Sequence, residues 1–170
     1  GRDSTGVAFR NADGRTQVYR QAIAATTFVK YHQKYIGEAR RSKVGILHTR
    51  RASPNMPVND GNAHPFVFRR VIFAHNGKVD NWKQVKEAWE KDDRVHADDK
   101  AYFAQITTDS QVLGPYLAMR NLTDVTGAMG LVWMIKGDVY CARSKKELVF
   151  ATIRWTAATN WTAAWVVMWA

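Results

Sequence analysis

The feature that most constrains this chain is the apolar run at residues 71–74, which leads directly into the tripeptide His75-Asn76-Gly77. The run predicts a buried strand that ends at the tripeptide, and a helix is expected to begin at residues 80–83. A strand that stops at Asn-Gly before a helix can direct a backbone N–H and a side-chain amide into a cleft, as an oxyanion hole requires. Asn-Gly is also a common turn dipeptide, so the tripeptide alone does not identify a site.

The length of 170 residues is enough for one domain with a hydrophobic core, and the 46% hydrophobic content is typical of a globular protein. No apolar run approaches the ~20 residues that cross a bilayer. The single cysteine, Cys141, excludes an internal disulfide and a cysteine-built zinc site, and we predict no metal and no cofactor. It also favours a reducing compartment, so we predict a cytoplasmic protein, or one within a large particle if its role is structural.

The net charge of +10 comes from 25 basic and 15 acidic side chains. Such an excess indicates either an anionic partner or a solvated basic surface, and we favour the surface. The basic residues are scattered: residues 40–43 and 145–146 fall where turns are expected, and Arg69-Arg70 interrupts an apolar strand. No interleaving of aromatic and basic residues resembles a single-strand binding face, so nucleic acid is not the favoured partner.

The periodicity of the apolar residues predicts many short strands with helices between and after them, which is an α+β layered fold. We expect strands at residues 7–9, 16–20, 44–47, 66–69, 71–74, 128–135, 139–143 and 148–152. We expect helices from Thr26 or Thr27 to Gly37, from residues 80–83, and from Ser110. Residues 53–61 and 91–100 read as loops, and the first is of a kind that usually covers a site. The tail places Trp155, Trp161, Trp165 and Trp169 at loosely helical spacing, which favours packing against the sheet, with an interface as the alternative.

Six short motifs occur in order along the chain. They are Gly1-Arg2-Asp3-Ser4-Thr5-Gly6, His48-Thr49-Arg50, Asn62-Ala63-His64-Pro65, His75-Asn76-Gly77, Thr108-Asp109-Ser110 and Gly127-Ala128-Met129-Gly130. Together they resemble the class II glutamine amidotransferases, which are glutaminase domains of the N-terminal-nucleophile hydrolase superfamily. The resemblance runs to about Thr152, and the tail at residues 153–170 is unmatched.

The resemblance implies a four-layer αββα sandwich of two mainly antiparallel sheets. It also implies hydrolysis of glutamine, with ammonia passed to a partner synthase or transferase. Arg50 would hold the α-carboxylate and Asp109 the α-ammonium, while the Asn76 side chain and the Gly77 N–H would form the oxyanion hole. Ser53 and His75 complete the expected substrate-binding set.

One departure from the family concerns the nucleophile, which is a cysteine at the mature N-terminus whose own amine acts as base. Gly1 aligns with an internal glycine of the first motif, so we expect the first strand and the nucleophile to precede Gly1. A neighbouring strand should then present an unpaired edge. Cys141 is expected to be a packed strand residue rather than a nucleophile. The chain as written is therefore predicted not to hydrolyse glutamine.

Three functions remain open. The first is a glutamine amidotransferase domain, the second is a catalytically inactive structural or assembly subunit on the same fold, and the third is a basic nucleic-acid-binding module. A cysteine before Gly1 would favour the first and its absence the second, whereas steeply salt-dependent binding of nucleic acid would favour the third.

Overall fold

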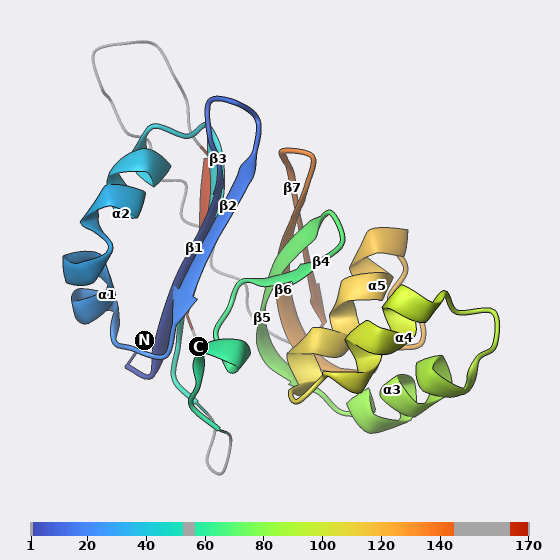
Figure 1. Ribbon diagram of the computed structural model, residues 1–170. Helices are drawn as coiled ribbons and strands as arrows, with labels where there is room; N and C mark the ends of the chain where they lie inside the picture. Colours follow the sequence, from blue (N-terminus) through green and yellow to red (C-terminus); the bar gives the residue numbers. More distant parts are fainter. Residues whose placement is uncertain (1, 53–56, 145–163, 170) are drawn as a thin grey trace.

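The computed structural model describes residues 2–52, 57–144 and 164–169, and it has four layers (Figure 1). Two sheets pack face to face. Helices α1 and α2 cover the outer face of one sheet, and α3, α4 and α5 cover the outer face of the other. The predicted αββα sandwich is confirmed. Within the described part of the chain, no helix is both long enough and apolar enough to span a bilayer.

The first sheet, sheet A, has the strand order β2-β1-β3-β8. Its strands are β1 (Ser4–Arg10), β2 (Thr16–Gln21), β3 (Val44–Arg50) and β8 (Ala164–Trp169). β1 pairs antiparallel with β2 and β3, whereas β8 pairs parallel with β3. The expected unpaired edge beside the first strand is therefore wrong, because β1 and β3 each have a partner on both sides. Helical spacing in the tail is also wrong for residues 164–169, which form a strand.

The second sheet, sheet B, is an antiparallel meander with the order β4-β5-β6-β7. Its strands are β4 (Phe66–Phe68), β5 (Val71–Val79), β6 (Gly127–Ile135) and β7 (Asp138–Ser144). β5 does not end at His75 as the sequence predicted. It continues through Asn76 and Gly77 to Val79, and every one of its residues has a partner on β6. Ladder pairing along the whole of β6 overrides the local turn preference of Asn-Gly.

The helices differ from the sequence-based expectation at their ends. They are α1 (Ala25–Tyr31), α2 (Gln33–Arg40), α3 (Trp82–Lys91), α4 (Ala97–Ala104) and α5 (Leu113–Met119). The single helix expected to stop at Gly37 is in fact two, with the break at His32. Residues 97–100, expected in a loop, form the first turn of α4, and α5 follows a 3₁₀ turn, η2 (Asp109–Val112).

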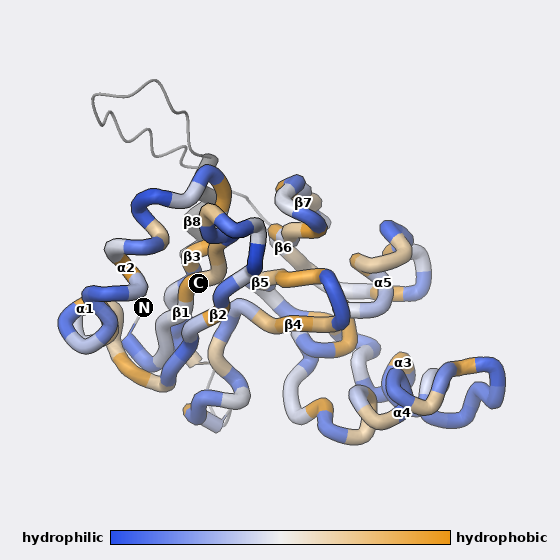
Figure 2. Tube along the Cα trace, turned by 45° about the horizontal axis from the view of Figure 1, so that its top comes forward, coloured by the Kyte–Doolittle hydropathy of each residue, from blue (hydrophilic) through white to orange (hydrophobic). Residues whose placement is uncertain are grey.

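Three apolar clusters separate the four layers. The central cluster lies between the sheets, with Ala8 and Ile46 from sheet A against Ile72, Val132 and Met134 from sheet B. A large aromatic-rich cluster joins sheet B to α3, α4 and α5, and a smaller one joins sheet A to α1 and α2. Figure 2 shows hydrophobic colour along β4 and β5 and mostly hydrophilic colour on the connection between α3 and α4. Burial of these apolar faces fixes how the sheets stack.

Candidate functional site

Arg50 is the last residue of β3, where the two sheets meet at one end of the sandwich. Its backbone is held by β1, because Ser4 lies opposite it and its carbonyl accepts a hydrogen bond from the Asp3 N–H at 3.1 Å. The Asp3 carboxylate in turn accepts a hydrogen bond from the Ala52 N–H at 2.8 Å. That bond, with Arg2 in second place, lowers the pKa of Asp3. The chain on both sides of Arg50 is therefore anchored to the start of β1.

Asp109 comes from the other half of the molecule, at the start of η2. A capping box between Thr108 and Gln111 sets the geometry of this turn. One carboxylate oxygen of Asp109 accepts a hydrogen bond from the backbone N–H of Val79 at 2.8 Å. The carboxylate is therefore tied to β5, two residues beyond Gly77.

Arg50 and Asp109 influence each other electrostatically across the two sheets. Burial lowers the pKa of Arg50, and the negative charges of Asp109 and then Asp3 oppose this effect. The half-buried guanidinium thus lies within the field of a carboxylate that is fixed to β5. A cation and an anion held apart on two rigid supports can hold the two ends of one amino acid.

Asn76 and Gly77 occupy the same end of β5, opposite Gly130 and Met129 of β6. Gly77 has a φ of +123°, and a Cβ on it would lie 1.9 Å from the carbonyl oxygen of Ala128. Only glycine fits such a close approach. Both predicted oxyanion-hole residues therefore lie within a strand rather than in a turn, close to the support of Asp109.

His75 precedes this pair and is buried. Its Nδ1 is 2.8 Å from the hydroxyl oxygen of Ser110, so β5 and η2 are joined a second time, beside Asp109. Ser53, the remaining predicted substrate-binding residue, lies outside the described residues.

Sequence reasoning missed a histidine cluster behind this site. His48 of β3 and His64 of the loop before β4 are both buried, and their ring centroids are 4.4 Å apart. Burial lowers the pKa of His48 to about 3, and electrostatic interaction with His75 and Arg50 adds to the effect, whereas a hydrogen bond to the His75 backbone opposes it. The pKa of His64 is lowered well below its ordinary value by burial and then by His48. The signal was present in the sequence, since each residue belongs to one of the six motifs.

Neutral imidazole is a common metal ligand, but the histidines do not form a metal centre. No group of three or more His, Cys, Asp or Glu side chains in residues 2–52 and 57–144 is placed to hold a metal ion. The cluster instead packs between the sheets, where His64 also makes an edge contact with Phe66 at 4.5 Å between ring centroids.

Cys141 lies on β7 and is exposed, so the expectation of a packed cysteine is wrong. Among the described strands, β7 has a partner on one side only, which leaves its side chains less covered than those of β6. Cys141 is opposite Val132, which is opposite Ala74. Two strand spacings across and two residues along put it ~12 Å from Asn76.

The chain was compared with the sequences of known proteins. No family model matches the chain. The glutamine–fructose-6-phosphate aminotransferase of Brucella abortus is 30% identical over 143 residues, which cover 81% of this chain. That of Shouchella clausii is 29% identical over 152 residues, which cover 86%. In both cases the match spans 23% of the relative's length.

Solved structures that align with this chain include glutamine aminotransferases and amidotransferases. The glutamine aminotransferase class-II domain protein of Silicibacter pomeroyi aligns with a TM-score of 0.52 at 20% identity, over 86% of this chain and 71% of that one. The glutamine phosphoribosylpyrophosphate amidotransferase of B. subtilis aligns with a TM-score of 0.50 at 20% identity, over 84% of this chain and 31% of that one. At this level of identity the likeness supports the fold alone.

Proposed function

The chain belongs to the class II glutamine amidotransferase domains, and from this premise we propose that its site binds glutamine and positions the side-chain amide for hydrolysis to glutamate and ammonia. The observation that carries the proposal is the placement of the Arg50 guanidinium within the electrostatic influence of Asp109, which is fixed to β5 beside Asn76 and Gly77. An amino-acid substrate needs a cation for its carboxylate, an anion for its ammonium and donors for its amide oxygen.

Each residue has a distinct part in the proposed site. The fork of Arg50 donates two hydrogen bonds to the α-carboxylate, and Asp109 accepts from the α-ammonium while its other oxygen stays on Val79. The Asn76 amide and the Gly77 N–H stabilise the oxyanion that forms when the amide carbon is attacked. The hydrogen bond between His75 and Ser110 keeps η2 at a fixed position against β5.

Ammonia released at such a site would pass to a synthase or transferase, either fused to this domain or bound to it. The matched region is 23% of the length of the relatives, which supports a domain of this kind fused to a further part of the chain in those proteins. A cytoplasmic location remains part of the proposal. Assembly into a larger particle and binding of nucleic acid remain predictions of the two alternative functions.

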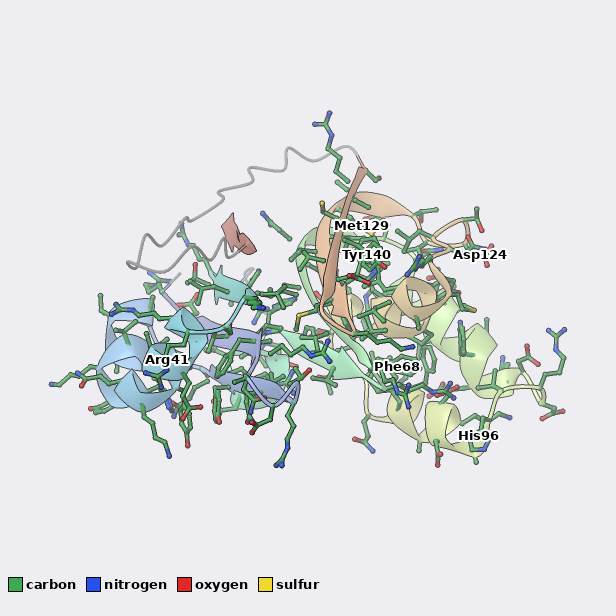
Figure 3. The ribbon with its side chains drawn as sticks, turned by 90° about the horizontal axis from the view of Figure 1, so that it is seen from above. Arg41, Phe68, His96, Asp124, Met129 and Tyr140 are labelled. Atoms are coloured by element: carbon green, nitrogen blue, oxygen red, sulfur yellow. The ribbon has the colours of Figure 1, made fainter. Side chains whose placement is uncertain are left out.

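Glutamine binding tests the proposal without requiring a nucleophile. Titration of the protein with L-glutamine in a calorimeter should give one saturable site. Arg50→Gln removes a charge-assisted bidentate contact of about 1.5–3 kcal/mol, so the affinity should fall roughly 10- to 100-fold. Arg41→Gln is the matched control, because Arg41 is exposed on the outer helical layer, away from the sheets (Figure 3). Equal loss of affinity in both variants, or no binding at all, would reject the site.

A catalytically inactive glutamine-binding domain is the second candidate, and Cys141 is not placed to act as the nucleophile in either candidate. The sequence holds one cysteine, and it is exposed and ~12 Å from Asn76, too far to attack a bound amide. Ammonia release by the natural full-length protein separates the candidates. Release that Asn76→Ala abolishes supports hydrolysis, whereas saturable glutamine binding without release supports the inactive subunit.

A further inference from the structure

Three hairpin tips converge at the end of the sandwich opposite the glutamine site. They are the β1–β2, β4–β5 and β6–β7 connections, and the first and last stand at the top of Figure 1 while the N-terminus lies at the bottom. β1 runs from Ser4, beside Arg50, to Arg10 at this far end, a span of ~20 Å. A pocket of 510 Å³ opens between the tips. It is separate from the proposed glutamine site.

Each tip contributes at least one cation to the pocket. Arg10, Arg69, Arg70 and Lys136 line it, with Val67 and Ile72 supplying an apolar wall. Among the described residues no carboxylate lines the pocket, although Asp13 lies in the β1–β2 turn and Asp138 begins β7. Arg69 is neutralised by a bidentate ion pair with Asp99, at 3.0 and 2.7 Å. The remaining three cations gather positive charge around one recess.

Arg10 holds the pocket in shape. Its Nε donates to the Gly14 carbonyl at 2.9 Å within its own hairpin, and its Nη1 donates to the Lys136 carbonyl on the other sheet. Gly137 has a φ of +99°, and a Cβ there would lie 2.7 Å from the Arg10 guanidinium. The Arg10 side chain therefore links the two sheets at this end. Its guanidinium donates to backbone carbonyls and not to a carboxylate.

The backbone at the tips is unfavourable for the residues that occupy it. Lys136 and Arg69 have φ values of 55° and 51°, in the left-handed region that favours glycine and asparagine. The two-residue β6–β7 turn has positive φ at both positions, for which Asn-Gly is the usual sequence. Two long cations thus stand where local stability favours a small residue, and such outliers cluster at functional sites.

We propose that this pocket binds a small phosphate-bearing molecule. Arginine and lysine donors match phosphate oxygens, and the volume suits a ligand of metabolite size. The apolar wall at Val67 and Ile72 can contact an organic body attached to the phosphate. A recess bounded by three hairpin tips fits a compact anion better than an extended polyanion, which needs a groove along the surface.

Calorimetric titration with inorganic phosphate and with phenyl phosphate at low salt tests the proposal. We expect saturable binding that falls at least tenfold in Lys136→Asn and in Arg70→Gln. Asn suits the left-handed conformation, so Lys136→Asn should keep or raise the thermal unfolding midpoint, which separates loss of binding from loss of fold. Tighter binding of phenyl phosphate identifies a phosphate ester as the ligand class, and equal binding identifies free phosphate.

Arg120→Asn is the matched control. Arg120 also has a left-handed φ, of 55°, but it lies at the end of α5 and its guanidinium sits over the ring of Tyr140, labelled in Figure 3. Its replacement should leave phosphate binding unchanged. The proposal is overturned if neither probe binds saturably, if Lys136→Asn binds as the unaltered protein does, or if only a labelled oligonucleotide binds. None of these outcomes depends on glutamine.

Discussion

A Cβ on Gly6 would lie 2.0 Å from the carbonyl oxygen of His64. Gly6 is on β1, opposite His48 of β3, and the loop that carries His64 rests directly on its backbone. The first and third motifs can therefore pack this closely only because Gly6 has no Cβ. This contact places the His64 ring against His48.

Gly6→Ala should destabilise the protein, because the obstructing atom belongs to the backbone and cannot rotate away. We expect a loss of about 1–3 kcal/mol or more in the free energy of unfolding, measured by urea denaturation. Gly37→Ala is the control: it lies in α2 with nothing within 4 Å of a built Cβ. That variant should gain about 0.5–1 kcal/mol. Equal effects of the two substitutions would contradict the close packing at Gly6.

Stability should fall in acid because of the buried histidines. The pKa values of His48 and His64 in the folded protein lie below their ordinary value of 6.5, so the unfolded chain binds more protons. The contribution of His48 is complete above pH 6.5 and is lost as the pH falls toward 3, by ~1.4 kcal/mol per pH unit, and that of His64 is lost in the same direction.

His48→Gln should reduce this slope of unfolding free energy against pH. His96→Gln, an exchange of the same kind at an exposed position before α4, is the control for the substitution itself (Figure 3). Urea denaturation between pH 4.5 and 7, at ~0.5-unit steps, measures both slopes. A slope that His48→Gln leaves unaltered would show that this histidine is not buried neutral.

Asp109→Asn should separate binding from folding. The asparagine oxygen can still accept the hydrogen bond from the Val79 N–H, so we expect unfolding to change by less than about 1 kcal/mol. The negative charge for the α-ammonium is lost, and glutamine affinity should fall roughly 10- to 100-fold. Asp124→Asn, on an exposed turn labelled in Figure 3, provides the control in the same calorimetric titration. Undiminished affinity in Asp109→Asn would remove Asp109 from the proposed site.

Cys141→Ala should change neither the stability nor the activity of the protein appreciably. The side chain is exposed on β7, so the free energy of unfolding should stay within about 0.5 kcal/mol of that of the unaltered protein. The native thiol should react with Ellman's reagent at a rate close to that of a free peptide thiol. If glutamine hydrolysis is observed in the full-length protein, the same substitution should leave its rate unchanged. A protected thiol, or a rate that collapses, would contradict the position of Cys141 described above.

The sequence by itself determined the α+β class of the fold and the order of the motifs, and the four-layer arrangement was an implication of the family resemblance. Alternating short apolar runs and amphipathic segments predict strands and helices because burial of one face is a local property of the pattern. The strands expected at residues 7–9 and 16–20, and those expected at 128–135 and 139–143, form antiparallel hairpins in the structure. The motif resemblance supplied Arg50, Asp109, Asn76 and Gly77 as site residues, a prediction that glutamine titration has still to test.

Only the tertiary structure decided how β5 ends and which strand lies beside β3. Asn76-Gly77 has a strong local preference for a turn, but pairing with β6 continues past it, and that partner lies more than fifty residues away in the chain. β8 pairs with β3 over an even longer separation, where tryptophan spacing indicated a helix. The buried histidine pair and the basic pocket likewise unite segments that are distant in sequence. Contacts of this kind depend on how the layers stack, and a local pattern carries no information about that stacking.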